Sequence, residues 1–176
     1  DYFNVPVDEL VSKNYARKIA EKIKNKETTK IQPGMLIKES EETTHFSIID
    51  KWGNAVSNTY TLNGAYGSGI VAKGTGILMN NEMDDFSQKP GYPNLYGLIG
   101  SEANKIEPKK SPLSSMSPVI VSKDNMPYLI TGSPGGSTII NSVFQEIINI
   151  LDFEMSLEES SNCLLYTSPS PRDRYG

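Results

Sequence analysis

The chain has a single cysteine, Cys163, and a single histidine, His45, among its 176 residues. One cysteine cannot close an intramolecular disulfide, so thiol content gives no information on the redox compartment. A zinc site or a serine–histidine triad is disfavoured, because His45 has no second histidine or nearby cysteine beside it. We expect no metal site, and we interpret His45 as a residue that supports the strand carrying it.

Long apolar runs and an excess of positive charge are also missing. No stretch approaches the ~18–20 apolar residues of a membrane span. Lysine and arginine number 17 against 21 acidic residues, for a net charge of −4 without a basic block, so nucleic acid is not an expected partner. The first residues lack a secretion-signal pattern and an initiator methionine, so we expect the chain to be an internal piece of a longer protein.

Apolar residues recur every fourth position near the start of the chain, at Val11, Tyr15, Ile19 and Ile23. Acidic residues precede this pattern and lysines follow it, which predicts an amphipathic helix over residues 7–24. Residues 25–42 are polar and contain a Pro-Gly pair, so they are predicted to form an exposed linker.

Two regions show the pattern of a β-hairpin. Residues 43–62 contain two β-prone runs joined by a glycine turn, and residues 117–132 repeat the pattern. Between them, residues 76–81 resemble a short buried strand, while the proline- and glycine-rich residues 87–112 are predicted to form a long loop. Loops of that length in compact domains are usually functional or disordered.

A glycine-rich segment at residues 132–137 precedes an apolar stripe with helical spacing. The stripe is expected to pack in the core, and it consists of Ile140, Val143, Phe144, Ile147, Ile148 and Leu151. Ser156 and Glu159 have capping-box spacing and predict the start of another helix. The residues from Cys163 to Asp173 match an in-frame translation of a sequencing adapter, so residues 162–176 are treated as a non-native tail.

Thr43 directly follows the predicted linker. An internal threonine is a poor nucleophile, but a threonine at a chain start has a free α-amine that titrates at roughly 7.7–8.0 and can take the hydroxyl proton. Cleavage between Glu42 and Thr43 would therefore create a nucleophile and a base in one residue. The alternative is a threonine that serves β-strand propensity alone.

Five short clusters follow one another along the chain: Thr43–Ser47, Thr59–Asn63, Asn80–Phe86, Pro112–Pro118 and Thr131–Ser137. Together and in this order they resemble the γ-glutamyltranspeptidase family of N-terminal-nucleophile hydrolases. The resemblance implies an α/β protein with a four-layer α-β-β-α fold, incomplete in this chain. It also implies that residues 1–42 end a large subunit, that residues 43–161 begin a small catalytic subunit, and that the precursor cuts itself between them.

The same resemblance assigns catalytic roles. Thr43 is implied as the nucleophile, and Thr61 as a second threonine that assists processing and orientation. Asn63 is implied near the substrate amino group. The backbone N–H groups of Gly135 and Gly136 are implied as the oxyanion hole, which acyl transfer requires. From the residues alone, a strand threonine, a turn asparagine and a glycine turn remain alternatives.

A γ-glutamyl substrate presents an α-ammonium and an α-carboxylate, so its pocket needs an acid for the first and donors for the second. The resemblance implies Asp85 for the ammonium, with Glu82 contributing, and the paired Ser114 and Ser115 for the carboxylate. Tyr96 resembles the gating tyrosine of a lid loop. A surface tyrosine and an ordinary loop serine pair are the alternatives.

The implied activity is hydrolysis of glutathione and other γ-glutamyl compounds, or transfer of the γ-glutamyl group to amino acids or peptides, through a threonyl ester and without metal or organic cofactor. The large subunit from the same precursor is the implied partner, and the family implies a periplasmic or secreted location. A related cephalosporin-type acylase, or an inert binding domain that is never processed, are the alternative functions.

Overall fold

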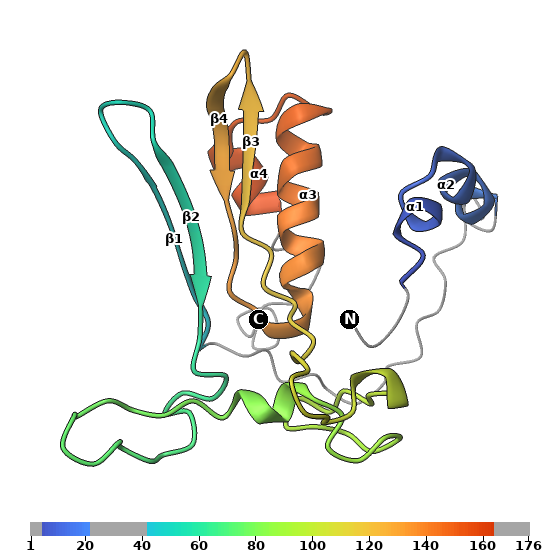
Figure 1. Cartoon of the computed structure of the whole chain (residues 1–176). Coiled ribbons are helices and arrows are strands. Elements are labelled where there is room, and N and C mark those ends of the chain that lie inside the picture. Colours follow the sequence, from blue (N-terminus) through green and yellow to red (C-terminus); the bar gives the residue numbers. More distant parts are fainter. Residues whose placement is uncertain (1–4, 22–41, 164–176) are drawn as a thin grey trace, which may run out of the picture. The chain divides into compact units, whose positions relative to one another are not determined.

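The computed structural model describes residues 5–21 and 42–163. The chain divides into two compact units, residues 1–38 with 86–112 and residues 39–85 with 113–176 (Figure 1). Most of the predicted linker and the tail beyond Cys163 lie outside the described residues.

The first unit begins with two short helices, α1 (Val7–Leu10) and α2 (Lys13–Ala20). Ser12 separates them with an extended backbone, and its hydroxyl oxygen accepts the Tyr15 N–H at 3.1 Å. An N-cap residue satisfies an amide that the first helical turn leaves unpaired, and it does so from outside the helix. The prediction of one helix over residues 7–24 is therefore wrong at Ser12, while residues 22–24 lie outside the described residues.

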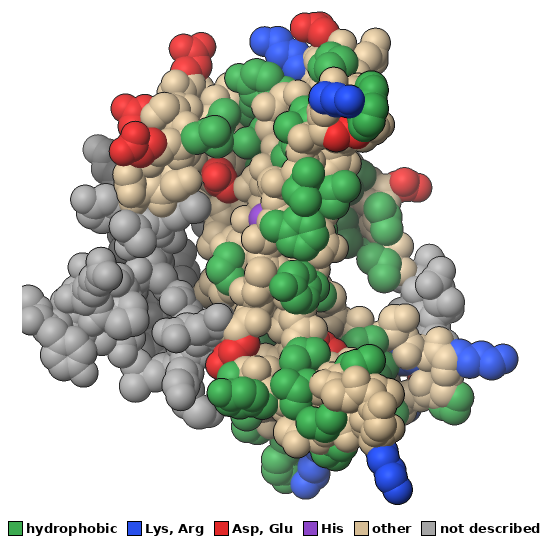
Figure 2. All heavy atoms as spheres, turned by 90° about the vertical axis from the view of Figure 1, so that its left-hand side faces the viewer, with side chains coloured by type: hydrophobic (Ala, Val, Ile, Leu, Met, Phe, Trp, Pro, Cys, Tyr) green, Lys and Arg blue, Asp and Glu red, His purple; other side chains and the backbone are tan. Residues whose placement is uncertain are grey.

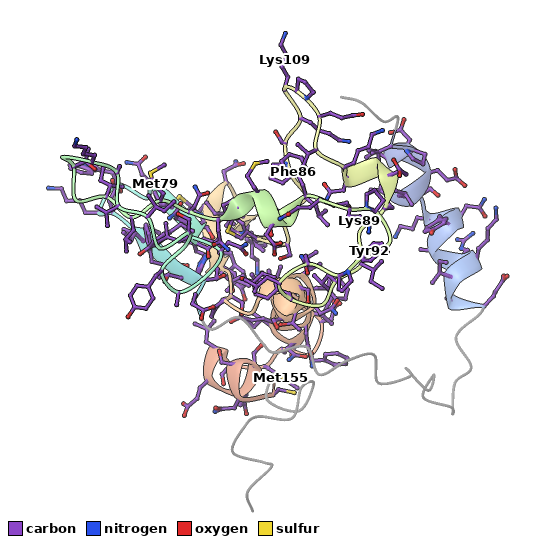
Figure 3. All side chains as sticks on the ribbon, turned by 90° about the horizontal axis from the view of Figure 1, so that it is seen from below. Met79, Phe86, Lys89, Tyr92, Lys109 and Met155 are labelled. Carbon is purple, nitrogen blue, oxygen red and sulfur yellow. The ribbon has the colours of Figure 1, made fainter. Side chains whose placement is uncertain are left out.

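The loop at residues 86–112 belongs to the first unit and contains one 3₁₀ turn, Glu102–Asn104, which confirms the predicted long loop. A bridge pairs Ser87 with Lys105 near the two ends of the loop. Within it, the Lys89 amino group lies 3.6 Å from the centre of the Tyr92 ring (Figure 3). These contacts fold the loop onto itself.

The second unit contains two antiparallel hairpins, which confirms both predictions. The first joins β1 (Thr44–Ile49) to β2 (Ala55–Tyr60), and the second joins β3 (Val119–Lys123) to β4 (Met126–Thr131). In the first turn, the Asp50 carboxylate accepts the N–H groups of Trp52 and Asn54 at 2.9 Å each. Such side-chain-to-backbone bonds allow the direction of the chain to reverse within a few residues.

The two hairpins are stacked, with helix α3 (Ile139–Leu151) beyond the second one (Figure 1). The Ser47 hydroxyl donates to the Ile130 carbonyl at 3.1 Å, and the Ser57 hydroxyl donates to the Thr131 carbonyl at 2.9 Å. Because side chains alternate along a strand, the face of β1–β2 that carries Ser47 and Ser57 lies against β4, and the face that carries Phe46 and Ile48 points away from it. Figure 2 shows hydrophobic side chains along this exposed face, which include Phe46, Ile48, Val56 and Tyr60.

The core of the second unit lies between β4 and α3, where Leu129, Ile139 and Val143 are buried. The expectation that the whole apolar stripe of α3 packs in the core is wrong for Phe144, which is 64% exposed, and for Ile140 and Leu151, which are also exposed. The apolar stripe of α3 is therefore wider than the part of the helix surface that other described residues cover.

The capping box is confirmed at helix α4 (Leu157–Cys163). The Glu159 N–H donates to the Ser156 hydroxyl oxygen at 3.2 Å, and the Glu159 carboxylate accepts the Ser156 N–H at 2.9 Å. This reciprocal pair satisfies two amides at the start of the helix.

The strand predicted at residues 76–81 is wrong. Only an isolated bridge between Val71 and Leu78 forms there, and Ile77 is exposed. Gly74 and Gly76 have φ angles of +79° and +74°, and this left-handed backbone interrupts the extended run.

The second unit therefore has a β-β-α succession of layers, and its mixed helix and strand content agrees with the predicted α/β class. No helix in the described part of the chain is long and apolar enough to cross a membrane.

Candidate active site

Thr43 lies directly before β1, and its side chain is only 8% exposed. The register pairs Thr44 with Tyr60, so the next position on each strand brings Thr43 opposite Thr61. Residues opposite one another in an antiparallel pair have Cβ atoms about 4.5–5.5 Å apart. Both threonines that the sequence singled out thus lie at the same end of the hairpin, directly beyond its last pair.

Thr61 and Asn63 follow strand β2 and lie in the turn after it. Strand β2 ends at Tyr60, and Asn63 has a left-handed φ of +72°. The Asn63 N–H donates to the Thr61 hydroxyl oxygen at 2.9 Å, which closes a turn between them. Asparagine tolerates this backbone better than most residues, so it suits this position of the turn.

Asn81 is a site residue that the sequence reasoning missed. Its side-chain oxygen accepts the Gly64 N–H at 2.9 Å. Its backbone carbonyl accepts the side-chain N–H of Asn63 at 3.3 Å, and Asn63 is only 4% exposed. Its own N–H donates to the Leu62 carbonyl at 3.1 Å. Asn81 therefore ties the turn after β2 to the acidic residues that follow it. Its place in an Asn-Asn pair before those acids was the only signal available.

The acidic residues form a short 3₁₀ helix, Glu82–Asp85, in which the Glu82 and Asp85 carboxyl groups are hydrogen-bonded. Burial raises the pKa of Glu82 to about 7, and the hydrogen bond and charge of Asp85 add to this effect. Burial also raises the pKa of Asp85, while the hydrogen bond from Glu82 lowers it and the charge of Asp84 raises it. Both carboxyl groups therefore favour holding a proton, and a cation that binds here would favour its release.

Gly135 and Gly136 have φ angles of +126° and +55°, in the region where glycine is favoured. They lead into a 3₁₀ turn, Gly136–Thr138, which continues as α3. The Gly135 carbonyl accepts both the N–H and the hydroxyl of Thr138, at 3.1 and 2.8 Å. Among residues 42–163, neither glycine N–H donates a hydrogen bond, so both can meet a negative oxygen.

The serine pair lies beside this glycine loop. The Ser115 hydroxyl donates to the Gly136 carbonyl at 2.7 Å, while the Ser114 oxygen accepts the Met116 N–H at 3.3 Å. A serine has one hydroxyl hydrogen, and Ser115 donates its hydrogen to the glycine loop. The Ser114 hydroxyl acts only as an acceptor in this contact, so its hydrogen can turn toward a ligand.

His45 joins three strands. Its Nδ1 lies 2.7 Å from the Thr59 hydroxyl on β2, and its Nε2 lies 3.0 Å from the Ser47 hydroxyl on β1. Its ring also contacts Gly132, which directly follows β4. This agrees with the interpretation of His45 as a supporting residue, although sequence reasoning did not find Gly132 as its partner.

Tyr96 lies in the 86–112 loop of the first unit, where its N–H donates to the Asn94 side-chain oxygen at 3.0 Å. Its gating role stays a prediction. Among the described residues, no group of three or more His, Cys, Asp or Glu side chains could hold a metal ion.

A threonine at the head of a β-hairpin, stacked on a second hairpin and a helix, is the arrangement of N-terminal-nucleophile hydrolases. The family model for gamma-glutamyltranspeptidase matches residues 1–163, and the chain belongs to this family.

The glutathione hydrolase proenzyme of Escherichia coli is 53% identical over 166 residues, which cover 92% of this chain and 29% of that protein. A crystal structure of a Helicobacter pylori gamma-glutamyltranspeptidase mutant superposes with a TM-score of 0.63 at 60% identity, over 66% of this chain and 63% of that one. An acylase proenzyme of a Pseudomonas species is 34% identical over 159 residues, covering 90% of this chain and 27% of that protein. The chain thus spans less than a third of the length of these curated relatives.

Proposed function

We propose that the full-length protein containing this chain hydrolyses glutathione and other γ-glutamyl compounds, or transfers their γ-glutamyl group to an amino acid or peptide. The observation that carries this proposal is one hydrogen-bonded turn. It links the hairpin end that holds Thr43 and Thr61, through Asn81, to the Glu82–Asp85 pair. This turn supports a site in which the proposed nucleophile and the proposed cation-binding pair belong to one local structure.

The catalyst arises by cleavage between Glu42 and Thr43. The Thr43 hydroxyl attacks the Glu42 carbonyl carbon, and the amide becomes an ester as the nitrogen leaves. The departing nitrogen takes up the hydroxyl proton and becomes the free α-amine of Thr43. Water then hydrolyses the ester, which frees the Thr43 hydroxyl and leaves a carboxylate on Glu42. Thr61, the next position in the register, orients the attacking group. The name of the Escherichia coli relative, a proenzyme, supports this step.

In the acyl transfer, the free amine of Thr43 takes the hydroxyl proton while the oxygen attacks the substrate γ-carbonyl. The N–H groups of Gly135 and Gly136 stabilise the negative oxygen that forms. The amine then returns the proton to the leaving nitrogen, and a γ-glutamyl ester remains on Thr43. Water or an acceptor amine resolves the ester, and no metal or organic cofactor takes part.

The head group of the substrate is held by groups of opposite charge and by hydrogen-bond donors. Asp85 and Glu82 bind the α-ammonium, and Asn63 lies near the amino group. Ser114 donates its hydroxyl hydrogen to the α-carboxylate, and Ser115 does so once it releases the Gly136 carbonyl on substrate binding. Tyr96 serves as the gate on the loop. An acylase would share the nucleophile, but it has less need of a carboxylate pair for an ammonium group, and its sequence similarity is lower.

The organisation follows the same proposal. Residues 1–42 end the large subunit and residues 43–161 begin the small one, while residues 162–176 are a non-native tail. A further helical layer of the α-β-β-α fold covers the exposed apolar face of β1–β2. The large subunit is the partner, and the protein acts in the periplasm or outside the cell.

The test compares the full-length gene product with its Thr43→Ala variant. Mass spectrometry should find a chain that starts at Thr43 in the unaltered protein and an uncut chain in the variant. Only the unaltered protein should release glutamate from a γ-glutamyl anilide. Thr44→Ala, which alters an exposed neighbour, is the matched control and should still be processed.

Three other results would contradict the proposal in different ways. An uncut unaltered protein would support the inert scaffold. A processed protein that acts only on cephalosporin side chains would support the acylase. Normal turnover by Thr43→Ala would exclude Thr43 as the nucleophile.

A further inference from the structure

We propose that His45 is a positioning residue, whose ring fixes the glycine loop at Gly135–Gly136 relative to Thr43 by filling the space beside Gly132. The inference rests on the proposed function, because it assigns a geometric role within that acyl transfer.

Gly132 has to be glycine because of the His45 ring. A Cβ atom added to Gly132 would overlap the Cε1, Nδ1 and Cγ atoms of His45. The φ angle of Gly132 lies outside the left-handed region, unlike those of Gly135 and Gly136. A positive φ therefore does not restrict this position to glycine, and the atoms nearest to an added Cβ all belong to the imidazole.

The His45 ring is held by a directional hydrogen-bond network. The single hydroxyl hydrogen of Ser47 goes to the Ile130 carbonyl, so its oxygen accepts the Nε2–H of His45. The neutral imidazole then has a lone pair on Nδ1, which accepts the Thr59 hydroxyl hydrogen at 2.7 Å. Both nitrogens are engaged, so the ring cannot turn without breaking a bond.

The environment of His45 favours the neutral form of its imidazole ring. Burial lowers the pKa of His45, and the charge of Glu146 on α3 opposes this effect only in part. The Glu146 carboxylate accepts the Thr131 hydroxyl. A neutral ring keeps the Nδ1 lone pair that the Thr59 bond requires.

This contact joins the two parts of the proposed oxyanion chemistry. On one side, His45 lies two residues after Thr43 on the same extended segment. On the other side, Gly132 lies three residues before Gly135, and the Ser57 bond to the Thr131 carbonyl fixes the end of β4. A displacement at Gly132 therefore moves the oxyanion donors relative to the attacking oxygen. A misplacement of about 1 Å can cost on the order of 100-fold in rate.

The test is a size-exchange cycle in the full-length, processed protein, with Gly132→Ala, His45→Ala and the double variant. Gly132→Ala should lower kcat for a γ-glutamyl anilide by on the order of 10- to 100-fold, with KM changed less than about two-fold. His45→Ala should also lower kcat. In the His45→Ala background, Gly132→Ala should cost less than about two-fold, because the overlap is gone. Burst amplitudes give the active fraction and separate positioning from loss of folded protein.

The control pairs Gly132→Ala with Ile120→Ala, an exposed residue on β3, and there the two effects should add. If Gly132→Ala is insoluble, recovery of soluble, active enzyme in the double variant supports the proposal. If the double variant is also insoluble, His45→Ala alone decides: unchanged kcat per active site overturns the proposal. An additive His45–Gly132 cycle, or a rise in KM at constant kcat, also overturns it. Failure of the unaltered protein to process or turn over would instead refute the proposed function.

Discussion

Protonation of Glu82 should control how well the enzyme captures its substrate. Burial and the neighbouring Asp85 raise the pKa of Glu82 to about 7. In the proposed site only the ionised carboxylate attracts the α-ammonium of a γ-glutamyl substrate. The ratio kcat/KM should therefore follow the ionisation of Glu82, since that ratio reports groups of the free enzyme.

The size of the effect follows from this pKa. With a pKa of about 7, roughly 90% of Glu82 is ionised at pH 8 and roughly 3% at pH 5.5, a loss of about 30-fold in the competent form. With its ordinary value of 4.5, the same change would cost about 10%. The expected losses of ionised Glu82 at the two pKa values therefore differ by more than an order of magnitude.

The proposed free amine of Thr43 complicates the measurement because an α-amine ordinarily titrates at roughly 7.7–8.0. Both groups must lose a proton, so below about pH 6.5 the logarithm of kcat/KM should rise with a slope of about two. Glu82→Gln should reduce this slope to about one, because only the amine remains. Glu158→Gln, an exposed change on α4, should keep the slope of two. A slope of one in the unaltered enzyme would refute the reasoning.

Stability gives an independent check with a defined sign. Between pH 4.5 and 7 the folded state binds more protons at Glu82 than the unfolded state, so the unfolding free energy falls as pH rises. The difference in pKa corresponds to about 3 kcal/mol before solvent screening and to on the order of 1 kcal/mol after it, because the carboxyl is only part-buried. Glu82→Gln should melt higher than the unaltered protein at pH 8, and equally below pH 4.

Two further predictions concern single side chains. Asn81→Ala leaves the Gly64 N–H without its partner and loosens the acidic pair, so KM for the γ-glutamyl donor should rise about ten-fold. Asn141→Ala, an exposed change on α3, is the control. An unchanged KM in Asn81→Ala would contradict the proposed role of Asn81. Ser156→Ala removes the N-cap of α4, so chemical denaturation should show that the free energy of unfolding falls by about 1 kcal/mol. Ser161→Ala, an exposed change on the same helix, should leave the free energy of unfolding unchanged. Equal losses in the two variants would contradict the capping role of Ser156.

Local patterns predicted the local structure well. Both hairpins and the capping box at Ser156 depend on alternation, turn residues and spacing within a few positions, so they could be read directly. The errors have local causes too. Ser12 carries an N-cap signal inside an apparently continuous helical pattern, and Gly74 and Gly76 interrupt the strand expected nearby.

Burial could not be predicted in the same way. The stripe on α3 has correct helical spacing, yet Phe144 is exposed while Val143 is buried. Periodicity identifies an apolar face, but the width of the face that is covered depends on what packs against it.

The sequence by itself determined the candidate nucleophile, the hairpin that carries it, and the clusters by which the family is recognised. Only the tertiary structure decided which of these residues meet. Asn81 joins the acids to the turn after β2, and His45 fills the space beside Gly132, through contacts between residues far apart in the chain. Such contacts depend on how hairpins stack and turns close, and no local pattern of side chains encodes that geometry.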